Sequence, residues 1–366
     1  MKNHSINNLY PKISAYWGPW YRVVLTAVFL IFMIALAQGC TSGHSAPTAT
    51  LNSTPELRGI KQWPSELVYN QGELGSNPAN QLAFIVRYFS TINSDGVIDY
   101  SKHMDASRLY IYWNARYLDS QIDPSGGGSV DIDTGSSVTS SVLSLKYFGA
   151  CPENTSVEVI KINGVDLSGS YVYKGWPYID DDIQFKKEPD PMSYYFSETK
   201  NIQTINLESG SFYGKTLTVN PYGNIRDAFD FIEIANQFIN TDPHYQNTSA
   251  EKLQVLNLIM NALYKNHPIF IGLKFDDEFN SYRVRTTGVV SMPNIQNFQA
   301  VGGQSFVIVG YDYYIAGSSS KYFKCMNSWG PEWGDKGFVY FPEEYITNVN
   351  IFSTGAYETW FNSPLQ

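Results

Sequence analysis

The chain has 366 residues, of which 43% are hydrophobic and only 16% charged, a composition that excludes a chain disordered throughout. The formal net charge of -9, without any Lys/Arg cluster, argues against a nucleic-acid partner. Three widely separated cysteines are too few for a disulfide framework or a cysteine-based zinc site.

The N-terminal segment has the layout of a signal peptide. An uncharged run from Val23 to Ala37 follows basic residues, and it is shorter than the roughly 20 apolar residues of a membrane span. The segment LAQGC, which ends at Cys40, resembles a bacterial lipobox. This resemblance predicts removal of residues 1–39 and lipidation of Cys40. The alternatives are an ordinary secretory signal or an uncleaved anchor, and all three place the remaining chain outside the cytoplasm.

The rest of the chain divides into a tether and one domain. Residues 40–56 are rich in Ser, Thr, Ala and Pro, which predicts a flexible tether. Residues 57–366 follow without a low-complexity linker or an internal repeat, so we expect a single folded domain. The element pattern divides this domain into a helical lobe at about 57–215 and a β lobe at about 216–366.

Apolar spacing predicts helices first and strands later. Asn77-Pro78 supplies an N-cap followed by proline at the first helical position. Three-to-four spacing of apolar residues predicts helices over 78–89, 107–117, 137–147, 224–238 and 249–265. Short apolar runs predict strands over 268–275, 305–311, 322–326 and 337–341. This order predicts an α+β fold.

Three segments of the domain together form a recognisable set of motifs. They are YNQGELGSN at 69–77, GGQSFVIVGYD at 302–312 and NSWGPEWGDKG at 327–337. Together they resemble the papain-like cysteine peptidase family, in its compact bacterial branch without a long propeptide. Weaker similarity between them extends the resemblance over about 57–366. It implies a two-lobe fold with a helical N-terminal lobe, an antiparallel sheet or barrel in the C-terminal lobe, and a cleft between them.

The resemblance also assigns four positions of the catalytic site. Gln71 matches the glutamine that binds the oxyanion, and Asn327 matches the asparagine that orients the imidazole. Asn77 stands where the family has its nucleophilic cysteine, and Gln304 stands where it has its catalytic histidine. A carboxamide is neither a nucleophile nor a base near neutral pH, so we expect no peptidase activity. Gln71 and Asn327 also admit purely structural interpretations as residues that hold their loops.

Other residues offer weaker catalytic alternatives. Ser76 and Ser305 flank the two replaced positions, but Ser305 neighbours Gln304 on a predicted strand and is expected to face away from the cleft. Cys151 and Cys325 are expected to be small buried residues, and a bridge between them is unsupported. We expect His267 to be a turn or surface histidine.

The residues imply no cofactor. We find neither a phosphate-binding glycine loop nor metal-ligand spacing, and the acidic run at 180–182 is interpreted as a solvated turn. The predicted function is therefore an inactive, extracytoplasmic peptidase homologue. Its expected partners are a peptide or protein segment in the cleft and the membrane at its N-terminus. The alternatives are an active peptidase with an unusual catalytic constellation and a structural or adhesive surface component.

Overall fold

The structure, a computed structural model, does not describe the predicted signal peptide, Cys40 or most of the tether. It describes residues 51–52, 68–92, 99, 103–122, 129–155, 157–158, 161–162, 165–166, 172–190, 193–194, 197, 204–206, 216–218, 228–234, 248–315, 318, 320–348 and 351–362. Within these ranges, no helix combines the length and hydropathy that crossing a membrane requires.

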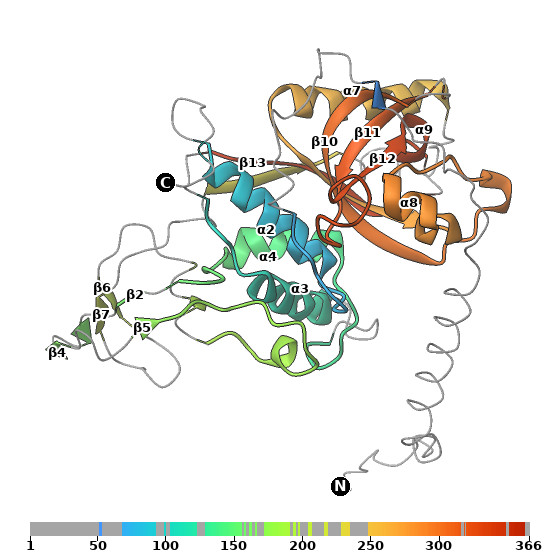
Figure 1. The fold of residues 1–366 in the computed structure, drawn as a ribbon. Helices are drawn as coiled ribbons and strands as arrows, with labels where there is room; N and C mark the ends of the chain where they lie inside the picture. The colour runs from blue at the N-terminus through green and yellow to red at the C-terminus, as the bar shows by residue number, and fades with distance from the viewer. Residues whose placement is uncertain are drawn as a thin grey trace, which may run out of the picture. The chain divides into compact units, whose positions relative to one another are not determined.

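Three helices pack together in the first half of the domain (Figure 1). They are α2 (Asn77–Ser90), α3 (Arg108–Ile122) and α4 (Val138–Phe148). The helices predicted at 78–89, 107–117 and 137–147 are confirmed. Ser137 caps α4 by accepting a hydrogen bond from the Ser140 backbone N–H at 3.0 Å.

Three further described α-helices belong to the second half of the domain. The longest is α7 (Ser249–Tyr264), which confirms the predicted helix at 249–265, and the shorter ones are α8 (Tyr282–Thr287) and α9 (Glu343–Ile346). Thr248 begins α7 with a capping box, in which its hydroxyl accepts from the Glu251 backbone N–H and the Glu251 carboxylate accepts from the Thr248 backbone N–H.

We expect Thr248→Ala to lower the free energy of unfolding by about 1 kcal/mol, because the start of α7 loses the hydroxyl half of this box. Urea denaturation of the two proteins measures the difference. Thr286→Ala is a suitable control, since its exposed hydroxyl lies within the last turn of α8. An equal loss in both variants would contradict the capping role.

A seven-stranded antiparallel sheet is the main element of the second lobe. Its order is β12-β11-β10-β9-β13-β8, and β1 pairs with the end of β10. The strands are β1 (Leu51–Asn52), β8 (Phe229–Glu233), β9 (Ile269–Phe275), β10 (Gly302–Ile315), β11 (Lys321–Met326), β12 (Phe338–Pro342) and β13 (Phe352–Phe361). The four predicted strands are therefore confirmed, and two residues of the predicted tether form a strand.

The helix predicted at 224–238 is wrong over its described part. Residues 229–233 form β8, which pairs with β13 through Phe231↔Thr359. Phe229 is buried whereas Ile232 is 51% exposed, and the Phe229 and Phe361 rings lie 5.4 Å apart. Pairing with β13 therefore outweighs the local helical pattern.

Short strands also occur between the helices and the large sheet. They are β2 (Val157–Glu158), β3 (Lys161–Ile162), β4 (Val165–Asp166), β5 (Val172–Tyr173), β6 (Thr204–Asn206) and β7 (Thr216–Thr218). β7 lies just beyond the predicted lobe boundary at 215/216, yet it pairs with β3 and β6 before that boundary. The predicted helical lobe thus also contains small sheets.

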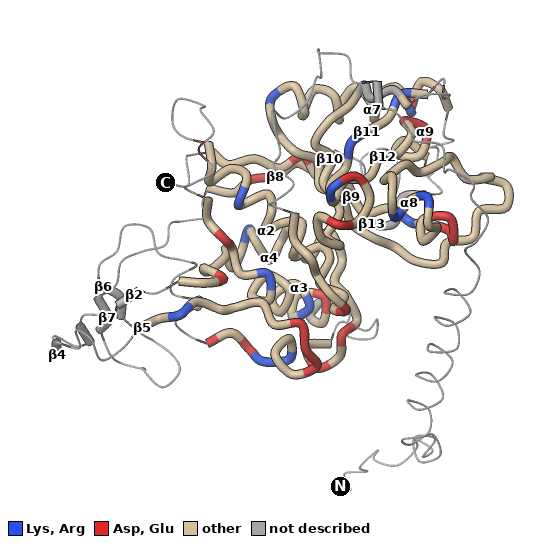
Figure 2. Tube along the Cα trace, in the orientation of Figure 1, with Lys and Arg blue, Asp and Glu red and all other residues tan. Residues whose placement is uncertain are grey.

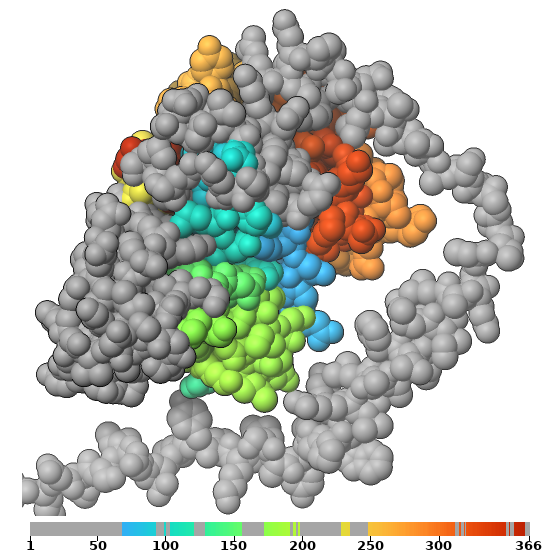
Figure 3. Space-filling view, turned by 60° about the vertical axis from the view of Figure 1, so that its left-hand side comes forward, coloured from blue at the N-terminus to red at the C-terminus, as the bar shows by residue number. Residues whose placement is uncertain are grey.

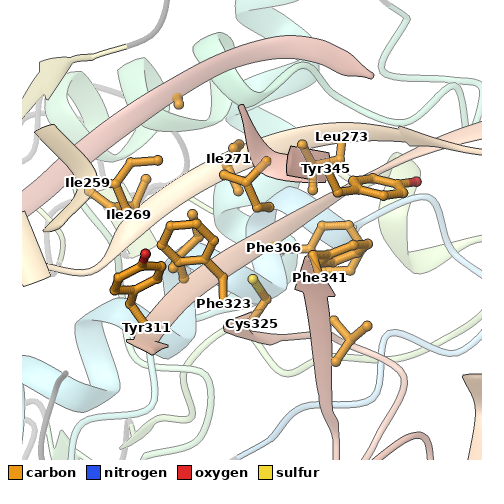
Figure 4. Packing of buried hydrophobic residues seen from close by; sticks show 14 of the residues in the cluster. Ile259, Ile269, Ile271, Leu273, Phe306, Tyr311, Phe323, Cys325, Phe341 and Tyr345 are labelled. Atoms are coloured by element: carbon orange, nitrogen blue, oxygen red, sulfur yellow. The ribbon is translucent and has the colours of Figure 1, made fainter. Parts of the chain in front are cut away.

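The large sheet is covered on both faces, which explains the uninterrupted apolar run in β10. Phe306 and Ile308 belong to a core cluster with Phe323, Phe341 and Tyr345, shown in Figure 4. Val307 and Val309 face the other way and belong to a cluster that includes α2, α3 and α4 side chains. Alternate residues of one strand therefore pack into two cores.

Charged residues are dispersed over the described chain. Figure 2 shows Lys and Arg as well as Asp and Glu in both the helical and the β half. Among the described residues, neither sign is confined to one lobe. In Figure 3, the segment around 68–80 reaches the surface between residues 172–190 and residues of the β lobe near 320–340.

Candidate active site at the start of helix α2

The loop before α2 is hydrogen-bonded to the segment that follows β11. Asn70 forms an isolated antiparallel bridge with Trp329. The Gln71 backbone N–H donates to the Ser328 carbonyl at 2.8 Å, and the Gly330 N–H donates to the Tyr69 carbonyl at 3.0 Å. The first and third segments of the sequence pattern therefore lie side by side.

Gly72 allows this loop to pass the acidic turn at 180–182. Its φ is +63°, and a Cβ at this position would lie 1.7 Å from the Asp180 Oδ2 atom. Asp180 in turn accepts from the Glu73 backbone N–H at 3.1 Å, and Asp181 accepts from the Ile183 N–H at 2.9 Å. These exposed carboxylates hold turns together.

The Gln71 side chain is 8% exposed and makes two bonds within the protein. Its Nε2 donates to the Leu74 carbonyl at 2.8 Å, and its Oε1 accepts from the Ser328 hydroxyl at 2.5 Å. The first bond holds the loop ahead of α2, so Gln71 has the structural role that its position before the helix allows.

The Asn77 side chain points into the protein and does not cap α2. Its Oδ1 accepts from the Ser305 backbone N–H at 2.7 Å and also from the Ser305 hydroxyl. Its Nδ2 donates to the Ser328 Oγ at 2.6 Å. The predicted N-cap role of Asn77 is wrong, because Ser76 occupies that position and makes no side-chain capping bond.

Gln304 and Asn327 form the second pair of the site. The Gln304 Nε2 donates to the Asn327 Oδ1 at 3.0 Å, and the same oxygen accepts from the Ser328 N–H at 2.9 Å. Gln304 is half-buried and Asn327 fully buried. The four residues singled out from the sequence thus meet around Ser328 in a network without an ionisable side chain.

Ser305 lies on the face of β10 opposite Gln304, as predicted, but it still contacts a residue of the site. Alternation does place Ser305 on the face of Val307 and Val309, opposite Gln304, but that face packs against the helical lobe. Helix α2 begins there, so Asn77 meets the Ser305 hydroxyl. Ser305 is 3% exposed and bonded to a carboxamide, so a serine nucleophile gains no support.

Sequence reasoning did not find Arg108 as a residue that supports this loop. Its guanidinium lies between the rings of Tyr69 and Tyr178, 4.5 and 3.8 Å from their centroids. It bonds Glu153 through two nitrogens at 2.6 and 2.8 Å and donates to the Asn70 carbonyl at 3.1 Å. Burial lowers the pKa of Arg108, but Glu153 outweighs that effect and the pKa is raised.

Tyr178 continues this support toward the site. Its hydroxyl donates to the Gln71 carbonyl at 2.6 Å and lies 2.6 Å from the Ser76 Oγ. Burial raises the pKa of Tyr178, so its hydroxyl stays protonated at neutral pH. Neither Arg108 nor Tyr178 lies in the three segments that carry the resemblance, so no specific signal in the sequence indicated this support.

The described cysteines and histidines lie in other surroundings. Cys151 and Cys325 are buried free thiols, as predicted, and no bridge joins them. His267 approaches Glu358 with its Nδ1 at 2.7 Å and stacks on Trp360, and His103 lies 3.4 Å from Asp105. None of these four residues bonds to Gln71, Asn77, Gln304 or Asn327 in any described contact.

We expect the free energy of unfolding to decrease as the pH rises above 9. Burial raises the pKa of Cys151 from 9.0 to about 12 and that of Cys325 well above 9.0. The unfolded thiols ionise near pH 9 while the folded ones do not. Stability is therefore fully present below pH 9, and each thiol costs about 1.4 kcal/mol per pH unit above it. Buried tyrosines add to the loss, since burial raises the pKa of Tyr357 to about 12.

Urea denaturation at pH 8 and pH 10 tests this dependence. A lower midpoint at pH 10 is expected, with a smaller decrease in Cys151→Ala. Equal midpoints at the two pH values would contradict the buried-thiol account.

A pocket lies away from this site. It has a volume of about 560 Å³ between the first turns of α7, the start of β11 and α9. Lys252 and Glu344 on its wall already pair with each other at 3.3 Å. No group of His, Cys, Asp and Glu side chains in the described ranges is arranged to hold a metal ion.

Comparison with known proteins supplies the class to which this fold and site belong. A family model described as papain family cysteine protease matches residues 149–359, which is more than half of the chain. The chain therefore belongs to the papain family, as the sequence pattern predicted. The match includes Gln304 and Asn327 but begins after Gln71 and Asn77. Both of these earlier residues form hydrogen bonds with Ser328, which lies in the matched part.

Individual relatives are distant. An uncharacterized peptidase C1-like protein of Acanthamoeba polyphaga mimivirus is 25% identical over 299 residues, which cover 81% of this chain and 71% of that protein. Human cathepsin L2 is 29% identical over 100 residues, covering 27% of this chain and 29% of cathepsin L2. Xylellain, a cysteine protease from Xylella fastidiosa, superposes with a TM-score of 0.48 and 20% identity over 88% of both chains.

Proposed function

We propose that this chain is a catalytically inactive papain-family protein that binds a peptide or protein segment between its lobes outside the cytoplasm. One observation carries the proposal: Asn77 and Gln304, the residues assigned to the nucleophile and base positions, are carboxamides bonded to other neutral groups. Carboxamides supply neither a thiolate nor a proton acceptor near neutral pH.

The geometry also disfavours residual chemistry by other residues. Catalysis by this family needs a nucleophile and base within hydrogen-bond reach of each other. Around Asn77 the described partners are the hydroxyls of Ser305 and Ser328 and a backbone N–H. Binding and oxyanion contacts alone leave a rate of roughly 10³-fold over water, which is far below that of a working peptidase.

Attachment to the cell envelope is the second part of the proposal. The uncharged run before Cys40 and the lipobox-like LAQGC segment support a lipid anchor. Metabolic labelling with an alkyne fatty acid is expected to mark the natural chain and not Cys40→Ser. Labelling of both chains, or of neither, would contradict lipidation at this cysteine.

A binding measurement tests the peptide-binding part. We expect the fluorescence anisotropy of a dye-labelled mixed peptide library to rise when the full chain is added. We expect a smaller rise with Gln304→Trp, because the larger side chain adds bulk between the lobes. Arg283→Ala, on the exposed surface of α8, serves as the control that leaves binding unchanged. No rise with a folded natural chain would contradict peptide binding and favour a structural or adhesive component.

A further inference from the structure

The Asn77 side chain lies where the helical lobe meets the β lobe. Asn77 is the first residue of α2, Ser305 belongs to β10, and Ser328 follows β11. All three described hydrogen bonds of the Asn77 carboxamide end on Ser305 or Ser328. Every one of these bonds therefore crosses between the lobes.

The strand register explains why the Ser305 backbone N–H is available to donate a hydrogen bond to a side chain. Ser305 pairs with Gly272 of β9 on one side, whereas β10 pairs with β11 only from Val307↔Met326 onward. The Ser305 N–H therefore lies outside the β10–β11 ladder. Asn77 accepts from it at 2.7 Å, in the place of the next strand.

A second carboxamide repeats the contact one turn later along α2. The Gln81 Nε2 donates to the Met326 carbonyl at 3.2 Å and lies 3.4 Å from the Ser305 carbonyl. Asn77 and Gln81 are 5% and 0% exposed, so water does not compete for these bonds. Two successive turns of α2 thus form hydrogen bonds with the same part of the sheet.

We propose that Asn77, at the position assigned to the lost nucleophile, joins the two lobes of this protein. This inference goes beyond the proposed function, because it assigns the replaced position a structural task. A carboxamide offers an acceptor and a donor group at fixed directions, and Asn77 uses both. A cysteine offers only one weak donor and one weak acceptor, so it cannot bond Ser305 and Ser328 in the same way.

The same hydrogen bonds fill the position that the catalytic groups have in the family. The Ser328 hydroxyl donates to Gln71 and accepts from Asn77, so the two carboxamides are coupled through one oxygen. The site is filled by bonds within the protein. A bound segment would therefore contact neutral side chains that are already hydrogen-bonded to each other.

Hydrogen–deuterium exchange of the Ser305 amide tests the proposal directly. We expect exchange to be roughly tenfold faster in Asn77→Ala, which corresponds to the loss of one buried hydrogen bond. Asn114→Ala is the matched control, since Asn114 is also fully buried but bonds Tyr110 and Tyr194 within the helical half. Unchanged protection of Ser305 in a folded Asn77→Ala variant would overturn the proposal.

A thermal double-mutant cycle provides a second readout from the other side of the contact. Ser305→Ala is expected to lower the midpoint less in the Asn77→Ala background than in the natural chain, because the two side chains act through the same bond. If Asn77→Ala does not fold, Asn77→Ser replaces it in the cycle. Additive midpoint shifts would overturn the proposal.

Discussion

Arg108→Ala is expected to lower the free energy of unfolding by about 3–5 kcal/mol. The substitution leaves the Glu153 carboxylate buried without the guanidinium that bonds it twice, since Glu153 is only 5% exposed. It also removes the cation between Tyr69 and Tyr178 and the bond to the Asn70 carbonyl. Guanidinium chloride denaturation measures the loss.

Two variants separate the buried charge from the general effect of truncating an arginine. Arg283→Ala removes an arginine paired with Glu278 at the surface, so it is expected to change stability by at most about 1 kcal/mol. Combining Arg108→Met with Glu153→Leu removes both charges and is expected to recover part of the loss. A small effect of Arg108→Ala, equal to that of Arg283→Ala, would contradict the account.

Phe306→Ala is expected to lower the free energy of unfolding by about 3–5 kcal/mol. Phe306 is fully buried in the core shown in Figure 4, with its ring centroid 5.0 Å from Phe341 and 5.8 Å from Phe279. Removing the ring leaves a cavity beside the rings of Phe279 and Phe341 that the surrounding sheet cannot close. Thermal or chemical denaturation reports the change.

Ile232→Ala is the control for this core substitution. Ile232 is also a large apolar side chain on a strand, but it is 51% exposed on β8. Its truncation is expected to change stability by about 0.5 kcal/mol or less. Similar losses in the two variants would show that burial in the β lobe is not what stabilises the sheet.

Local signals predicted much of the fold. Apolar spacing predicts helices α2, α4 and α7, and Pro78 adds a start signal for α2, whereas the caps at Ser137 and Thr248 emerge only from the structure. β8 was missed because its pairing partner lies more than a hundred residues away in β13. A local pattern carries no information about such a partner.

The sequence identified which residues form the candidate site but not how they bond. Gln71, Asn77, Gln304 and Asn327 were found from short motifs, and the structure brings them around Ser328. The inward direction of Asn77 could not be predicted, because it depends on the Ser305 N–H, which lies before the start of the β10–β11 pairing. The support by Arg108 likewise depends on three distant segments that meet only in the fold.

These contacts favour an account in which one position, Asn77, both lacks a nucleophile and joins the two lobes. Catalysis is expected to be absent because the site contains neutral amides. The lobes stay joined because Asn77, together with Gln81, bonds across the interface. Substitution at the nucleophile position is thus expected to alter the lobe contact as well as the chemistry.

Hydrolysis of a broad fluorogenic peptide library tests the central claim most directly. The purified natural chain is measured beside a variant that carries Asn77→Cys and Gln304→His. The account predicts no turnover by the natural chain above the rate of the same preparation after heat denaturation. Turnover by the natural chain that is lost when Ser76, Ser305 or another residue between the lobes is replaced by alanine would contradict it.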